Sequence, residues 1–124
     1  MERKVLIVTT IASMIKYFCM PLIDLLQKMG YEVQVACNFV DGNNISEEEI
    51  ADFKKELTEK NVVFYQIPFS RKITDPKNYQ CYKQLKSIVK EQKFSFIHCH
   101  TPIASLIARF VGRSTHTKVM YTAH

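Results

Sequence analysis

The distribution of apolar residues restricts the fold of this chain more than any other feature of its sequence. Short runs rich in β-branched residues alternate with longer stretches in which apolar residues recur every three or four positions. The first pattern is typical of strands buried in a sheet, and the second is typical of helices that cover a sheet. The expected strands span residues 4–9, 31–37, 62–67, 94–99 and 117–122.

This alternation predicts βαβ units, because parallel neighbouring strands are joined by right-handed crossovers. We therefore expect an α/β protein with a three-layer, Rossmann-like open parallel sheet and helices on both faces. The sheet should have about five strands in the order 3-2-1-4-5. The chain has 124 residues, of which 47% are hydrophobic, and it contains no linker-like segment. Residues 1–124 should thus form a single domain.

The first crossover is predicted to start as a loop at Thr10–Ser13 and to continue as a helix that ends at Gly30. Pro21 lies inside the helical pattern, so the helix should begin near Cys19 or be kinked there. The side chains expected to face the sheet are Phe18, Leu22, Leu25, Leu26 and Met29.

Capping signals mark the second helix. Ser46 and Glu49 have the spacing of a capping box, and three consecutive glutamates suit the positive end of the helix dipole. The narrow apolar face expected on this helix consists of Ile50, Phe53 and Leu57.

The last two helices each start beside a proline. Asp75 should cap the third helix, with Pro76 at its first position, and Thr101 should cap the fourth, followed by Pro102. Gly112 is predicted to end the fourth helix, whose scarcity of polar residues suggests cover on more than one side. The inward stripe expected on the third helix is Tyr79, Tyr82, Leu85, Ile88 and Val89.

Charge and cysteine content indicate the cellular environment of the protein but do not identify a binding partner. A net charge of +5 is compatible with an anionic membrane surface, a phosphorylated substrate or nucleic acid. No two of the four cysteines have the CxxC spacing of zinc ribbons or thioredoxin-type sites, which favours a reduced, cytosolic protein. No segment approaches the roughly 20 apolar residues of a membrane span.

The predicted topology places the candidate site at the carboxyl edge of the sheet. Ligands of open α/β sheets bind where the strand order reverses, here between the first and fourth strands. The loops at that point are 10–13 and 99–102, so His100 and the free N–H groups after Thr101 should face a ligand. His124 ends the neighbouring strand on the same edge.

Several candidate residues have a simpler structural interpretation. His98, Cys99 and His100 suggest a metal site, but their spacing fits no zinc signature, which favours histidines hydrogen-bonded at a sheet end. Arg71 and its neighbour Lys72 can hold a phosphate or form an exposed basic loop. Tyr17 and Phe18 can face an acceptor, although core packing is favoured for Phe18, and His116 is expected to be solvated.

Missing motifs exclude several enzyme classes. The loop after the first strand has no glycine, which argues against dinucleotide binding and against a P-loop. There is also no GxSxG elbow of the kind that esterases use. A receiver domain would need an acidic cluster after the first strand and an aspartate after the third, and both are absent.

The tail of the chain resembles a known family. IHCHTPIASLIARF followed by KVMYTAH is similar to the N-terminal half of family 4 glycosyltransferases with the GT-B fold, especially bacterial enzymes of capsular and exopolysaccharide synthesis. The upstream segments LLQKMGYEV and 69–78 resemble the same domain, so the resemblance covers nearly the whole chain.

This resemblance implies a function. Such enzymes move a sugar, with retention of configuration, from a nucleotide-sugar donor to an acceptor that is often a lipid-linked saccharide at the cytoplasmic membrane face. They need no metal as a rule, and we expect no cofactor and no nucleic-acid partner. The N-terminal domain mainly binds the acceptor, and the C-terminal domain binds the donor.

The resemblance also suggests roles for individual residues. His124 corresponds to the catalytic histidine that reaches toward the donor sugar. His100 and Thr101 are expected to line the same cleft. Arg71 is expected to contact substrate. The first-loop residues expected to face the donor phosphates or the acceptor are Thr10, Ile11, Ala12 and Ser13.

The sequence departs from the family after His124, and nothing in it matches a donor domain. We therefore expect an incomplete N-terminal half of a two-domain enzyme that is inactive alone. It should work in the cytoplasm, at the inner membrane face, and self-associate through the 101–111 helix and the sheet edge. The alternative is a non-enzymatic Rossmann-like binding or interaction module.

Overall fold

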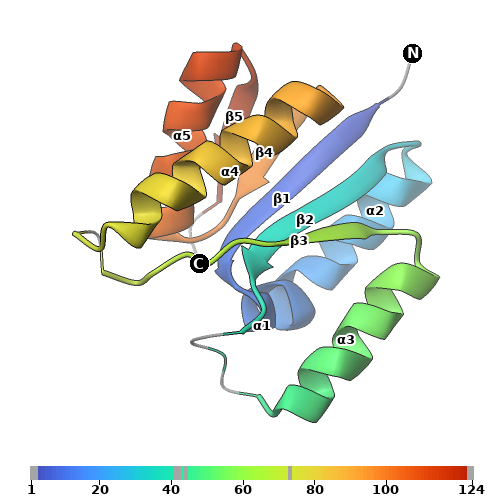
Figure 1. Cartoon of the computed structure of the whole chain (residues 1–124). Coiled ribbons are helices and arrows are strands. Elements are labelled where there is room, and N and C mark those ends of the chain that lie inside the picture. Colours follow the sequence, from blue (N-terminus) through green and yellow to red (C-terminus); the bar gives the residue numbers. More distant parts are fainter. Residues whose placement is uncertain (1–2, 41–42, 44, 73, 123–124) are drawn as a thin grey trace.

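A parallel sheet forms the centre of the molecule (Figure 1). The computed structural model describes residues 3–40, 43, 45–72 and 74–122. Within them, five strands pair in the order β3-β2-β1-β4-β5, and all neighbours are parallel, which confirms the predicted fold class. The strands are β1 (Lys4–Ile11), β2 (Glu32–Asn38), β3 (Val63–Gln66), β4 (Phe96–Cys99) and β5 (Lys118–Tyr121).

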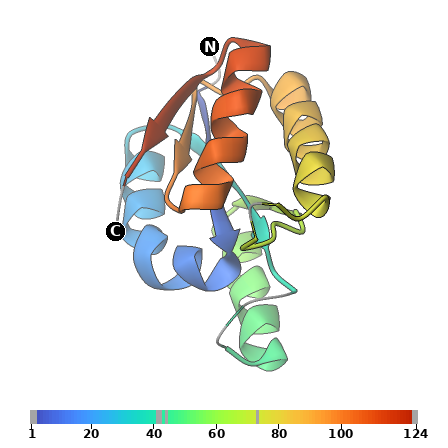
Figure 2. The ribbon, with the colours of Figure 1, turned by 90° about the vertical axis from the view of Figure 1, so that its left-hand side faces the viewer.

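Helices cover both faces of the sheet, as expected. The helices α2 and α3 lie on one face, and α4 and α5 lie side by side on the other (Figures 1 and 2). The helical segments are α1 (Ala12–Met14), a π-helical segment η1 (Ile15–Cys19), α2 (Met20–Lys28), α3 (Glu47–Glu59), α4 (Lys77–Gln92) and α5 (Pro102–Thr115).

The central strand β1 is buried on both faces. Val5 and Ile7 pack into the core beneath α2 and α3, whereas Leu6 and Val8 pack into the core beneath α4 and α5. All four side chains are completely buried. This position explains the continuous apolar run, because a strand with two covered faces cannot alternate polar and apolar residues.

The first crossover differs from the prediction. Thr10 and Ile11 belong to β1, and the helix starts at Ala12 without an intervening loop. The π-helical segment η1 precedes Pro21, so the predicted irregularity near Cys19 is confirmed.

The predicted inward face of this helix is only partly right: Leu26 is buried in the core and Leu22 packs against it, but the other three residues are exposed. Phe18 is 58% exposed and Leu25 and Met29 are each 54% exposed, so core packing of Phe18 is wrong. A π-helical turn contains more residues than an α-helical turn, which rotates the following side chains about the axis. The side chains that enter the core are Ala12, Ile15, Cys19, Ile23 and Leu26.

Helix α3 follows the prediction closely. The hydroxyl of Ser46 accepts a hydrogen bond from the backbone N–H of Glu49 at 3.1 Å. The buried residues of this helix are Ile50, Phe53 and Leu57, as expected.

Helices α4 and α5 agree less well with the prediction. Asp75 Oδ1 accepts a hydrogen bond from the N–H of Lys77, but α4 begins at Lys77, so Pro76 occupies the capping position that was predicted for Asp75. Tyr79 is 64% exposed and does not belong to the inward stripe. Gly112 does not end α5, which runs to Thr115 before His116 adopts a left-handed φ of 57°. His116 is exposed, as predicted.

The outer side of α5 is only partly covered. Leu106 and Phe110 are 38% and 53% exposed on that side. The sheet and α4 cover two other sides of the helix, as expected. Within the described part of the chain, no helix combines the length and the apolar character that crossing a membrane requires.

Candidate functional site

A hollow of about 470 Å³ opens at the carboxyl edge of the sheet, where the strand order reverses. Four of the residues predicted to bind substrate lie in its wall: Thr10, Ile11, Arg71 and Thr101. They come from the end of β1, the loop after β3 and the start of α5, which are distant in sequence. Apolar side chains complete the wall, namely Met14, Pro102 and Ile103.

A pair of threonines forms the polar part of this wall. The N–H of Thr10 donates to Thr101 Oγ1 at 2.9 Å, and the two hydroxyls lie 2.7 Å apart. Thr101 therefore occupies the position before α5, as predicted, but its side chain binds β1 instead of capping its own helix. The contact fixes the start of α5 to the end of the central strand.

Side-chain amides hold the loop that carries Arg71. Asn38 Nδ2 donates to the carbonyl of Phe69 at 3.2 Å. Asn78 accepts from the N–H of Ser70 at 3.2 Å and donates to the carbonyl of Lys72 at 2.9 Å. These bonds fix the backbone on both sides of Arg71. The exposed side chain of Arg71 therefore extends from a fixed point of the loop.

Arg71 also borders a second, smaller hollow. This hollow of about 160 Å³ shares Ile11 and Arg71 with the first and is lined further by Asp75 and Lys77. Hydrogen bonds from the backbone N–H of Lys77 and from Ser70 lower the pKa of Asp75, with smaller help from nearby lysines. The edge thus offers an apolar hollow and an adjoining charged hollow, with Arg71 between them.

The two histidines of β4 form a hydrogen-bonded pair. His98 Nδ1 lies 2.6 Å from His100 Nε2, and the Thr122 hydroxyl lies 3.1 Å from His98 Nε2. These contacts connect the ends of β4 and β5 and confirm the simpler interpretation of hydrogen-bonded sheet-end histidines. The intervening Cys99 points to the other face, where its thiol donates to the carbonyl of Met120 at 3.2 Å and burial raises its pKa.

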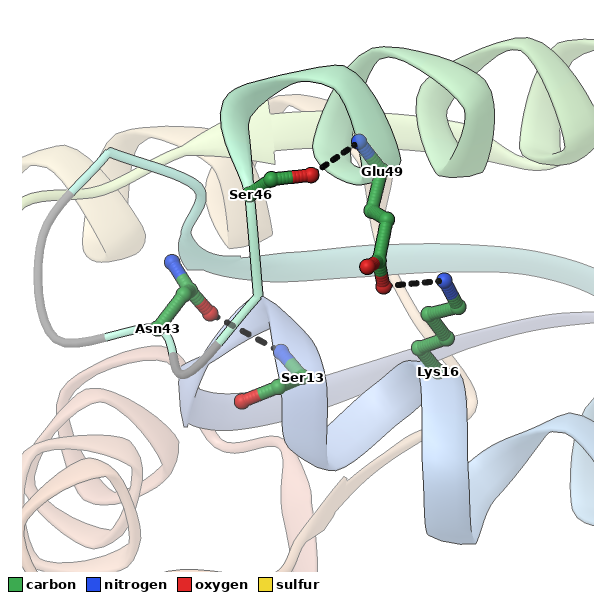
Figure 3. Close-up of polar contacts among 5 residues, drawn as sticks. All are labelled: Ser13, Lys16, Asn43, Ser46 and Glu49. Carbon is green, nitrogen blue, oxygen red and sulfur yellow. Dashed lines mark hydrogen bonds and ion pairs between the residues drawn. The ribbon is translucent and has the colours of Figure 1, made fainter.

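The other predicted site residues that the structure describes do not line the hollow. His100 is only 5% exposed, and Ala12 and Ser13 are buried. The N–H of Ser13 donates to Asn43 Oδ1 at 2.9 Å, so this helix start binds a neighbouring loop (Figure 3). Substrate contact by these residues stays a prediction, and His124 falls outside the described residues.

Sequence reasoning missed the amides that organise this edge. Asn38 is 3% exposed, and its oxygen accepts from the N–H of Val40 and from Gln66 Nε2. Asn43 in turn donates to the carbonyl of Asn38 at 3.1 Å. The sequence signal that could have indicated this role is the position of Asn38 directly after the second apolar run. A buried amide at such a position can hydrogen-bond the backbone groups of the loop.

Comparison with known proteins identifies the family of the chain. Residues 4–124 match the model of the family described as glycosyl transferase 4-like. Among curated proteins, one named "Putative glycosyltransferase EpsD", from Bacillus subtilis (strain 168), is 32% identical over 127 residues. That match covers 100% of this chain and 29% of EpsD.

Solved structures show the same fold at low sequence identity. MurG of Acinetobacter baumannii has a TM-score of 0.69 at 16% identity, covering 98% of this chain and 34% of its own. A glycosyltransferase of Rickettsia africae ESF-5 has a TM-score of 0.69 at 11% identity, with 98% and 30% covered. The resemblance to the N-terminal domain of family 4 enzymes with the GT-B fold is thereby confirmed. The chain belongs to the glycosyl transferase 4-like family.

Proposed function

We propose that this chain is the acceptor-binding half of a retaining glycosyltransferase of capsule or exopolysaccharide synthesis. The enzyme would move a hexose from a nucleotide-sugar donor to a lipid-linked saccharide in the cytoplasm, at the inner face of the cell membrane. The observation that carries the proposal is the hollow at the strand-order reversal, which gathers Thr10, Arg71 and Thr101 from three distant segments.

The composition of the hollow suits an acceptor with both sugar and phosphate groups. Ile11, Met14 and Ile103 provide an apolar surface against which a sugar ring can pack. The hydroxyls of Thr10 and Thr101 can exchange hydrogen bonds with sugar hydroxyls, since each hydroxyl both donates and accepts. Arg71 can bind a phosphate through two parallel N–H donors.

The donor side of the reaction needs residues beyond those that line the hollow. The chain spans 29% of the length of EpsD, so a second domain that binds the nucleotide sugar is part of the proposal. His124 would reach the donor sugar, while His100, His98 and the first helix turn would support this edge of the cleft. Without a donor domain the chain should transfer no sugar.

Acceptor binding tests the proposal directly. Titration calorimetry with a polyprenyl-pyrophosphate-linked saccharide would compare the chain with Arg71→Gln and with Lys72→Gln. Both changes remove one positive charge from the same exposed loop, but Lys72 does not line the hollow. We expect Arg71→Gln to weaken binding about tenfold or more, because a charged hydrogen bond to phosphate is lost, and Lys72→Gln to change it less than about twofold.

A second measurement tests catalysis. A protein that joins this chain to a donor domain would be assayed with a panel of nucleotide sugars, and His124→Ala should lower kcat far more than it changes acceptor KM. Sugar transfer by residues 1–124 alone would contradict the proposal. Equal effects of the Arg71 and Lys72 variants, with no transfer by the joined protein, would favour a non-enzymatic binding module.

A further inference from the structure

Two exposed aromatic side chains follow one another on the π-helical segment η1. Tyr17 is 56% exposed and Phe18 is 58% exposed, while the next residue, Cys19, is completely buried. The segment thus exposes the larger apolar side chain and buries the smaller one, although burial of the larger one would remove more apolar surface from water. Single π-helical turns are rare and frequently occur at functional sites.

The contacts of the first helix show which way Phe18 faces. Lys16 Nζ lies 3.5 Å from Glu49 Oε2 of α3, so Lys16 marks the side of the helix that faces α3 (Figure 3). Phe18 comes two residues later and lies on roughly the opposite side, because successive residues of a helix are about 100° apart. Helix α3 packs against β3, so the opposite side of the first helix lies toward β4 and β5.

The sheet presents an imidazole and an apolar side chain on that side. Ile7 of β1 faces the core beneath α2 and α3, and it is in register with His98 of β4, which is in register with Met120 of β5. Residues in register on parallel strands point to the same face, so His98 and Met120 share this face. The helices of the face pack against β1, β2 and β3, and Met120 is 43% exposed.

Phe18 also continues the wall of the hollow at the carboxyl edge. Met14 lines the hollow and precedes Phe18 by four residues, which places the two side chains on the same side of the helix. Arg71 borders the hollow from the loop after β3, whereas Phe18 lies on the side of β4 and β5. An extended ligand held at Arg71 would therefore cross the hollow toward Phe18 and the end of β5.

We propose that Phe18 stacks against the terminal sugar of the acceptor, the unit that receives the transferred hexose. This role rests on the proposed function, in which Arg71 binds the acceptor phosphate. The sugar next to the phosphate would pack against Met14, and the following sugar would lie on the ring of Phe18. The face of an aromatic ring carries partial negative charge, which attracts the polarised C–H groups of a pyranose. The acceptor is thus a disaccharide or a longer saccharide.

Two exposed residues of the same helix provide matched controls. Tyr17 is the direct neighbour of Phe18 and equally exposed, but its ring lies about 100° away around the helix, where Lys16 Nζ is 5.6 Å from its centre. Leu25 is 54% exposed and lies on the same side as Phe18, about two turns farther from the hollow.

Titration calorimetry would use two acceptors that differ by one sugar. They are prenyl pyrophosphates that carry either N-acetylglucosamine or its disaccharide. We expect Phe18→Ser to weaken binding of the disaccharide acceptor about fivefold or more and that of the monosaccharide acceptor less than about twofold. Tyr17→Ser and Leu25→Ser should change both affinities less than about twofold. Urea unfolding would confirm that the variants are folded.

Fluorescence gives a direct test of contact, because the chain contains no tryptophan. Phe18→Trp introduces a single indole, whose emission should shift when the disaccharide acceptor binds. The monosaccharide acceptor should leave this emission unchanged. The emission of Tyr17→Trp should respond to neither acceptor.

Three outcomes would overturn the role of Phe18 alone. One is an unchanged affinity of Phe18→Ser for the disaccharide acceptor, and another is an equal loss for both acceptors. The third is a dimer in analytical ultracentrifugation that Phe18→Ser and Leu25→Ser both dissociate, which would assign this side of the helix to self-association. The proposed function stands in these cases if Arg71→Gln weakens binding of both acceptors. Absence of binding of either acceptor to the unchanged chain would overturn both proposals.

Discussion

The two helical layers are attached by different means. On one face, polar contacts join neighbouring helices: Lys60 Nζ lies 2.7 Å from Asp24 Oδ1, and Gln27 Nε2 donates to the carbonyl of Lys60 at 2.8 Å. Lys16 and Glu49 lie 3.5 Å apart in the same layer (Figure 3). On the other face, a single pair of hydroxyls joins the helices, Tyr82 Oη and Ser114 Oγ at 2.7 Å, among the contacts that the structure describes. There α5 approaches the sheet through small residues, namely Ala104, Ala108 and Gly112.

This difference predicts that the two layers respond differently to substitutions. Exposed ion pairs contribute about 0–1 kcal/mol each, so the layer of α2 and α3 should tolerate substitution of its polar contacts. The layer of α4 and α5 depends on close approach, which tolerates added volume poorly. The same layer carries the helix start that lines the hollow at the sheet edge. The tightly packed layer thus holds this part of the proposed binding site in place.

The largest expected effect comes from Gly112→Ala. A Cβ at this position would lie 2.7 Å from the carbonyl oxygen of Thr117, which is backbone, and 2.5 Å from Val119 Cγ2. We expect urea unfolding to show a loss of about 2–3 kcal/mol, because this overpacking outweighs the roughly 1 kcal/mol gained by alanine in a helix.

Gly30→Ala is the matched control in the other layer. Nothing lies within 4 Å of a Cβ at Gly30, so only its positive φ of 94° opposes the change. That strain should cost about 1 kcal/mol. If Gly112→Ala costs no more than Gly30→Ala, close approach does not distinguish the two layers.

An intermediate effect is expected at alkaline pH, because each layer buries a cysteine thiol. Burial raises the pKa of Cys19 from 9.0 to about 12 and that of Cys81 from 9.0 to about 11. Unfolded thiols ionise near pH 9, so these residues stabilise the fold fully below that pH. Their contribution is lost as the pH rises toward 11 for Cys81 and 12 for Cys19. Each thiol can lower the free energy of unfolding by at most about 1.4 kcal/mol per pH unit.

Denaturation between pH 8 and 12 would measure this loss in Cys19→Ala and in Cys81→Ala. Both variants lose packing at every pH, so the informative quantity is the slope of the free energy of unfolding against pH. We expect Cys19→Ala to flatten the slope over a wider range than Cys81→Ala. Equal slopes in both variants and the unchanged chain would show that burial does not control these thiols.

The sequence predicted the sheet and its order because burial on two faces leaves a direct apolar pattern in β1. It failed for the first helix because the π-helical segment η1 turns Phe18 outward and Cys19 inward, and periodicity assumes one helical repeat throughout. The failure lies where β1 passes directly into a helix, next to the hollow.

The site was predicted to a similar extent. Thr10 and Thr101 could be placed together because both were expected at the carboxyl ends of the two strands that flank the strand-order reversal. Only the structure places Arg71 beside them, since its loop follows a path set by the amides of Asn38 and Asn78. Such contacts depend on the folded arrangement and leave no spacing pattern in the chain.

The smallest expected effects compare the two helix starts. Ser46→Ala removes a capping bond from α3 and should cost about 1 kcal/mol without affecting the carboxyl edge. Thr101→Val should cost a similar amount, because it leaves the buried N–H of Thr10 without the acceptor 2.9 Å away. The two variants should therefore differ little in urea unfolding and clearly in acceptor affinity, which Thr101→Val alone should lower. If Ser46→Ala weakens acceptor binding equally, the loss follows general stability, and the polar wall formed by Thr10 and Thr101 has no separate role in binding.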